Sequence, residues 1–207
     1  MNVDAGISRQ FKNGNNQSLT ISAGPSFNLN KTPVLFNNER SQLTTAGAGF
    51  NAGFQLNYKD LVEFNPKYIL NINRSHYTDA RFTNRDITGN VVTGELILRI
   101  PKKIVWETNL FYRVLNEVAP GLPTASIYWN AAVTLLMFNQ DKGQLRFAVY
   151  DILNSNTTVN RYFSGNSIID TRYNVLQRYF MLTYTYNIRT FGNQKAKVGG
   201  RQSLFNF

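Results

Sequence analysis

The chain has 207 residues, enough for one domain with a sizeable core, and a formal net charge of +10. It contains no cysteine, which excludes a disulfide framework and any thiolate metal site. No apolar run approaches the roughly 20 residues of a membrane helix, although 43% of the residues are hydrophobic.

The positive charge indicates either an anionic partner or a general basic bias. Nucleic acid and the lipopolysaccharide phosphates of a cell surface are the anionic partners that such a balance favours. The basic residues are spread along the chain, without the mixed aromatic and basic cluster that binds single-stranded nucleic acid. We therefore expect no nucleic-acid partner, and a scattered basic bias is the simpler interpretation.

Alternation of apolar and polar residues begins at the N-terminus. The pattern predicts a strand over 3–11, a tight turn at Asn13-Gly14, and a second strand over 18–27. Pro25 conflicts with the second strand, because proline normally occupies an edge position or a bulge. We expect a longer irregular segment over about 28–40.

The segment 44–59 has the clearest alternation in the chain. Ala46, Phe50 and Phe54 share one face with other apolar residues, while glycine and amide residues occupy the other face. Such a strand is longer than the roughly five or six residues usual in globular proteins and long enough for the roughly 9–11 residues that cross a tilted barrel wall.

The same period continues toward the C-terminus and predicts about nine strands and no helix. The strands after 44–59 are expected over 62–73, 92–100, 104–114, 127–137, 145–149 and 176–188. Tight turns near 60, 102 and 141 alternate with longer loops over 78–89, 116–125 and 154–173. Outer-membrane barrels show this alternation, with short periplasmic turns and longer extracellular loops.

These patterns predict an all-β, antiparallel, up-and-down transmembrane β-barrel of about nine to ten strands. Complete bacterial barrels have an even strand number and an export signal, and the start MNVDAGISRQF has no such signal. We therefore expect residues 1–192 to form the C-terminal portion of a larger barrel, located in the bacterial outer membrane. Residues 193–207 are expected to form a basic C-terminal tail.

The C-terminal part of the sequence resembles the TonB-dependent-receptor-like outer-membrane barrels of Bacteroidota. In that family, a strand ending in Asp-Leu/Ile-X-Asn precedes an outer loop, and an Arg-Tyr-Phe-Met-Leu segment begins the closing strand. The matching residues are Asp151, Asn154, Asp170, Thr171, Val175, Leu176, Arg178, Tyr179, Phe180, Met181, Leu182, Tyr186, Phe191 and Gly192.

The resemblance implies a 22-stranded barrel, an N-terminal plug and energy coupling through TonB, which would be supplied by regions preceding this chain. It implies a non-enzymatic role in uptake or passage of a solute across the outer membrane, with the solute undefined. The other expected partners are the lipid and lipopolysaccharide of that membrane. No cofactor, metal or catalytic residue is expected.

The polar face carries the candidate functional residues, which would face a lumen. These are Glu95, Arg99, Glu107, Asn109, Arg113 and Arg146. They could line a solute path or hold a plug, or they could form the salt-bridged wall that a wide, wet barrel requires. The simpler interpretation is the wall.

Two other functions remain open from the sequence. A soluble or surface β-sandwich binding carbohydrate or protein would have shorter strands and a dry core between two sheets. A barrel-embedded lipid hydrolase would use His76, the sole histidine, but its neighbour Ser75 is expected on the opposite face of a strand.

Overall fold

The computed structural model describes residues 1–14, 16–100, 102–118, 121, 123–155, 158–164, 167–173 and 176–188. These residues form one 11-stranded sheet and one separate two-stranded sheet. The only helix among them is the 3₁₀ turn η1 (Asn139–Asp141). No helix in the described part of the chain is long and apolar enough to cross a membrane.

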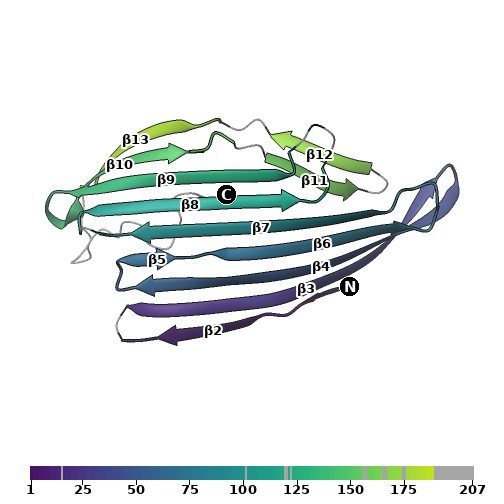
Figure 1. Ribbon diagram of the computed structural model, residues 1–207, viewed down its shortest axis with the longest axis horizontal. Helices are drawn as coiled ribbons and strands as arrows, with labels where there is room; N and C mark the ends of the chain where they lie inside the picture. The colour runs from purple at the N-terminus through teal and green to yellow at the C-terminus, as the bar shows by residue number, and fades with distance from the viewer. Residues whose placement is uncertain are drawn as a thin grey trace.

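The main sheet is antiparallel throughout, and the predicted all-β, up-and-down order is confirmed (Figure 1). Its strands are β1 (Asn2–Asp4), β2 (Ile7–Lys12), β3 (Gln17–Phe36), β4 (Glu39–Tyr58), β5 (Val62–Phe64), β6 (Lys67–Tyr77), β7 (Arg85–Leu98), β8 (Ile104–Leu115), β9 (Ala125–Met137), β10 (Gly143–Tyr150) and β13 (Tyr179–Tyr186). The second sheet pairs β11 (Thr158–Ser164) with β12 (Ser167–Tyr173).

The described strands form an open sheet rather than a closed ring. At one edge β1 and β2 pair with β3, and at the other edge β13 pairs with β10. No pairing joins these two edges within the described residues. Figure 1 shows β2 and β13 on opposite borders of the sheet.

Two strands are interrupted where proline removes a backbone donor. The predicted first strand divides into β1 and β2 opposite Pro25, whose carbonyl accepts the Ala5 N–H at 3.2 Å. Pro25 itself is in register with Phe50 of β4. The Pro25 conflict is thus accommodated because the N–H that proline lacks is not needed where β1 and β2 are interrupted. In the same way, Pro66 separates β5 from β6.

The prediction of an irregular segment over 28–40 is wrong. β3 and β4 pair continuously to Phe36 and Glu39, so each strand has 20 residues. Asn37 and Asn38 form the two-residue turn, with φ of 49° and 64°. Asparagine tolerates this left-handed conformation, which the favoured hairpin turns require. The alternation weakens along β3 here because residues 28–33 are exposed on both faces, so no apolar face is needed.

The prediction of one long loop over 154–173 is also wrong, because this segment contains the hairpin β11–β12. The loop predicted over 78–89 is shorter than expected, since β7 begins at Arg85, whereas the loop predicted over 116–125 agrees with the start of β9 at Ala125. The sorting of connections is confirmed only in part: the turns after β2, β4, β7 and β9 lie at one end of the sheet, and the longer excursions after β6, β8 and β10 lie at the other (Figure 1). The connection between β3 and β4 also lies at that second end but is a two-residue turn. The predicted tail over 193–207 lies outside the described residues.

Candidate functional site on the polar face of the sheet

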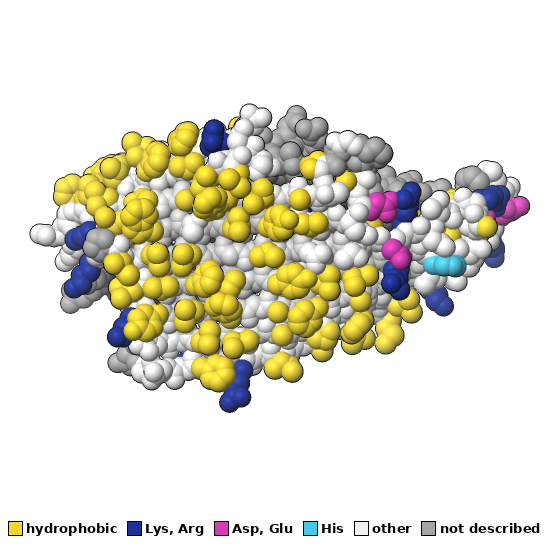
Figure 2. Space-filling model, viewed as in Figure 1, with side chains coloured by type: hydrophobic (Ala, Val, Ile, Leu, Met, Phe, Trp, Pro, Cys, Tyr) yellow, Lys and Arg dark blue, Asp and Glu magenta, His cyan; other side chains and the backbone are white. Residues whose placement is uncertain are grey.

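One face of the main sheet, here called the apolar face, carries large exposed hydrophobic side chains. Cross-strand register brings them into rows, such as Phe50 beside Leu70 and Phe147 beside Leu182. Phe50 is 41% exposed and Phe180 is 64% exposed. Figure 2 shows hydrophobic side chains across this face and charged ones mainly toward the strand ends. A face of this kind is suited to lipid rather than water.

The opposite face, here called the polar face, is the more buried one. Its buried residues include the polar Glu107, Asn109, Asn130 and Thr134 and the apolar Ile97, Val105, Ala132, Leu136 and Ala148. Globular proteins rarely bury charged and amide side chains while large apolar ones stay exposed, so the exposed apolar face and the polar groups buried on this one invert the usual distribution. A sheet that curls around a polar interior and meets lipid on its outside has this inversion.

All six predicted candidates lie on the polar face. Glu95, Asn109 and Asn130 are neighbours in register across β7, β8 and β9. Arg113 lies further along β8, level with Val91 and Ser126. The strand period alone brings these polar groups together, because residues two apart share a face.

The strongest interaction on this face is the ion pair between Glu107 and Arg146, in which Arg146 Nη1 donates to Glu107 Oε2. Their side chains are only 7% and 12% exposed. Burying two charges costs several kcal/mol, and partners with good geometry offset that cost. The pair connects β8 to β10 across β9 and stiffens the wall at this point.

The sixth candidate, Arg99, sits at the end where the short turns gather. Its Nη1 lies 2.7 Å from Glu63 Oε1 and also donates to the Asp60 carbonyl at 3.1 Å. This contact ties the β7–β8 turn to the β4–β5 turn. Arg99 therefore holds two connections together, separate from the Glu107–Arg146 pair.

Sequence reasoning missed Asn130, which is 1% exposed at the centre of the polar face. Its Oδ1 accepts the backbone N–H of Asp151 at 2.9 Å, and Asp151 Oδ1 accepts that of Ser155 at 3.0 Å. Asp151 adopts φ of 51° at the end of β10. The only signal for Asn130 was its parity in a strand, whereas Asp151 was identified through the family resemblance.

The motif residues of that resemblance meet around the start of β13. Asn154 Oδ1 accepts the backbone N–H of Arg178 at 3.1 Å, and Arg178 Nη1 donates to the Ile152 carbonyl at 3.2 Å. The Tyr150 and Tyr179 rings stack with centroids 4.5 Å apart. These contacts fix where β13 begins on β10. Val175, Phe191 and Gly192 of the motif lie outside the described residues.

Ser75 and His76 do not form a catalytic pair. Ser75 is buried on the polar face, and His76 is exposed on the apolar face. A serine hydrolase needs the hydroxyl within hydrogen-bond reach of the imidazole, which opposite faces of one strand prevent. No group of three or more His, Asp or Glu residues within the described ranges could hold a metal ion.

The β-sandwich alternative is wrong. A sandwich buries apolar side chains between two facing sheets, with strands of ordinary length. Here most large apolar side chains of the main sheet are exposed on one face, a small apolar cluster of Ile97, Val105 and Leu136 is buried on the other, and β3 and β4 each have 20 residues.

Comparison with known families gives one match. The family described as "outer membrane protein beta-barrel family" matches residues 42–186, from within β4 to the end of β13. No curated protein and no solved structure matches the chain at a significant level. The match confirms the barrel class and the bacterial outer membrane as the location.

Proposed function

Because the chain belongs to the outer membrane protein beta-barrel family, we propose that it forms part of the wall of a larger, solute-conducting barrel. The barrel is of the TonB-dependent-receptor-like kind, and its role is passage of a solute rather than catalysis. The partners proposed with it are a plug domain, TonB and the surrounding lipid.

The observation that carries this proposal is the chemistry of the polar face. It holds the buried Glu107–Arg146 pair and the row of Glu95, Asn109 and Asn130. A closed barrel would turn this face inward, where a polar wall suits the passage of a hydrophilic solute or contact with a plug. The apolar face opposite supplies the contact with lipid.

The free borders of the sheet support the larger ring. Backbone donors and acceptors on the outer edges of β2 and β13 have no partner strand within the described residues. Unpaired backbone groups cost several kcal/mol each in the hydrocarbon core, so membrane sheets close into rings. Further strands pairing with these two edges would meet that requirement.

The resemblance around β13 supports the specific kind of barrel. Asp151, Asn154 and Arg178 all take part in the contacts that position β13. Energy coupling through TonB follows from that resemblance and is the most detailed part of the proposal.

The test compares a strain lacking the protein with its parent during growth in a medium of many solutes. We expect at least one solute to remain in the medium of the deletion strain. A protonophore should produce the same loss in the parent, because energy-coupled uptake depends on the proton gradient. Restoring the full-length protein should restore depletion.

Identical depletion by the two strains would contradict a role in solute passage. Depletion that requires the protein but persists with the protonophore would contradict coupling through TonB. A strain producing the His76→Ala protein serves as a check on chemistry, since hydrolysis of lipid abolished by this change would contradict a non-enzymatic role.

A further inference from the structure

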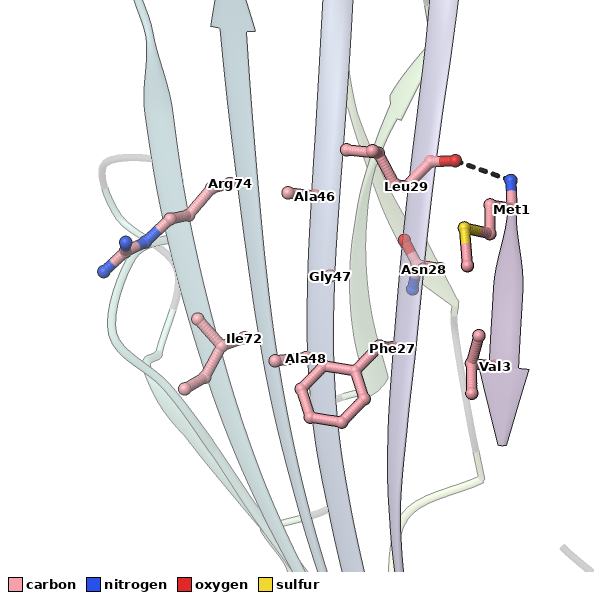
Figure 3. Close-up of a pocket in the computed structure, with 10 residues that line it drawn as sticks. All are labelled: Met1, Val3, Phe27, Asn28, Leu29, Ala46, Gly47, Ala48, Ile72 and Arg74. Atoms are coloured by element: carbon pink, nitrogen blue, oxygen red, sulfur yellow. Dashed lines mark hydrogen bonds between the residues drawn. The ribbon is translucent and has the colours of Figure 1, made fainter. Parts of the chain in front are cut away.

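A groove of about 500 Å³ opens on the apolar face near the end that carries the long loops. Its lining includes Phe27, Leu29, Ala46, Ala48, Ile72 and Arg74. Figure 3 shows the small Ala46 and Ala48 of β4 between the larger side chains of β3 and those of β6. Two alanines flanked by bulky residues leave a trough along the strand.

The row of small residues that forms the trough ends at a bulky one. On β4, the next residue of this face after Ala48 is Phe50, which lies beside Pro25 on one side and Leu70 on the other. Almost all of its lining is apolar. An apolar trough one strand wide accepts an aliphatic chain, since burial of methylene groups stabilises such a contact by about 0.8 kcal/mol each.

The upper end of the trough is cationic. Arg74 lies beside Ala46, and the next row of the same face contains Lys31, Thr44 and His76 in register. Lys31, Arg74 and His76 are all exposed. Positive groups at one end of an apolar trough match the chemistry of an anionic head group on an acyl chain.

The one acidic neighbour leaves Arg74 available to a ligand. Arg74 Nε lies 3.6 Å from Asp86 Oδ2, and both side chains are about two-thirds exposed or more, at 71% and 67%. Exposed ion pairs contribute about 0–1 kcal/mol. The guanidinium has five N–H donors in a fork, and phosphate accepts two of them together.

The distance of Lys31, Arg74 and His76 from the short-turn end of the sheet places them near the membrane surface. The stretch of β4 from Ala46 to Tyr58 spans roughly 40 Å at about 3.3 Å per residue, or roughly 30 Å at a tilt of about 40°. The apolar band of a membrane barrel is about 25 Å tall. With Tyr58 at the short-turn boundary, the Lys31–His76 row lies at the head-group level of the other leaflet.

We propose that the groove is a binding site for a phosphorylated glycolipid of the outer leaflet. One acyl chain lies between β3 and β6 over Ala46 and Ala48, and a phosphate contacts Lys31 and Arg74. The inference depends on the outer-membrane location and not on passage of a solute, so the two proposals can fail separately.

The experiment titrates the full-length protein in detergent with bisphosphorylated lipid A and counts bound lipids by native mass spectrometry. Its dephosphorylated form and phosphatidylglycerol are the comparison lipids. We expect the Lys31→Ala/Arg74→Ala double variant to lose about tenfold in affinity for bisphosphorylated lipid A, equivalent to about 1.4 kcal/mol. Ala48→Phe should weaken binding of all three lipids by filling the trough.

Two controls make the test specific. Ala52→Phe adds the same bulk to the same face of β4 beyond Phe50, and Lys59→Ala removes a cation from the opposite end; neither should change binding. Heat-modifiable migration in gels verifies that each variant is folded. Unchanged affinity in the double variant, equal binding of the dephosphorylated lipid or phosphatidylglycerol, or an equal effect of Ala52→Phe would overturn the proposal.

Discussion

The side chain of Asn154 accepts a hydrogen bond at 3.1 Å from the backbone N–H of Arg178, a residue 24 positions later in the chain. The contact joins the end of β10 to the start of β13, across an excursion that contains the hairpin β11–β12. It gives a structural reason for the Asp-Ile-Leu-Asn motif: its last residue fixes the register of the following strand.

Two substitutions of Asn154 separate the contribution of its side-chain hydrogen bond from that of its left-handed backbone conformation. The residue has φ of 52°, so Asn154→Ala loses the hydrogen bond and also pays for a left-handed alanine, at about 1–2 kcal/mol in total. Asn154→Gly loses the hydrogen bond but tolerates the conformation, so it should cost less. Urea unfolding of the refolded protein measures both; a larger loss for glycine than for alanine would contradict the role of backbone conformation.

The Glu107–Arg146 pair should show strong coupling. Arg146→Met leaves the Glu107 carboxylate buried without its partner, and the expected loss is about 3 kcal/mol. The double variant Glu107→Met/Arg146→Met removes both charges and should be more stable than either single variant. Unfolding free energies of the four proteins form a double-mutant cycle, and additive losses would show that the pair does not interact.

Gly24 and Gly94 differ in whether the structure has room for a Cβ atom. A Cβ on Gly24 would lie 2.3 Å from the Ala5 carbonyl oxygen, so Gly24→Ala must displace β1 and should destabilise the edge. A Cβ on Gly94 meets nothing within 4 Å, so Gly94→Ala should be neutral or stabilising by about 0.5–1 kcal/mol. Hydrogen exchange of the β1–β3 pairing measures the difference, and equal protection in the two variants would refute it.

The long-loop end contains a charge cluster with a defined response to pH. Arg81 contacts Glu39 and donates from Nε to Asp79 at 3.0 Å. The hydrogen bond from the Arg81 side chain, followed by that from its backbone N–H, lowers the pKa of Asp79 below its usual range. Because the pKa of Asp79 is lower in the folded loop than in the unfolded chain, ionised Asp79 stabilises the folded loop at any pH above its ordinary pKa. This stabilisation is lost as the pH falls through the lowered pKa of the folded state.

Protection of the 78–84 loop against hydrogen exchange, corrected for intrinsic rates, should therefore stay constant from about pH 7 to 5 and fall below about pH 4. Asp79→Asn should remove this dependence while retaining an oxygen acceptor. Loss of protection that begins near neutral pH, or an unchanged profile in Asp79→Asn, would assign the effect to other groups.

The sequence was sufficient to predict the two faces of the sheet. Phe50 and Glu95 were assigned to opposite faces because a strand exposed to lipid on one side and water on the other must alternate. The connections at the short-turn end were also predicted, since each strand there ends within a few residues of a polar turn.

Two features, the extension of the β3–β4 hairpin and the role of Asn130, could not be predicted from alternation along a strand. Residues 28–33 of β3 are exposed on both faces, so they need not alternate, and this part of the β3–β4 hairpin was missed. Asn130 was missed because a single amide in a mostly apolar strand does not reveal that Asp151, 21 positions later, will pack against it. Interactions between distant residues depend on register, which the pattern of one strand does not fix.

The most direct test of the two-faced sheet uses the absence of native cysteine. Single cysteines replace Phe50, Asn51, Phe54 and Gln55 on β4, and the full-length protein is reconstituted in liposomes. A water-soluble, membrane-impermeant maleimide should label Asn51→Cys and Gln55→Cys rapidly, and Phe50→Cys and Phe54→Cys at least about tenfold more slowly, because lipid covers the apolar face. Uniform labelling, or faster labelling at the phenylalanine positions, would contradict the account.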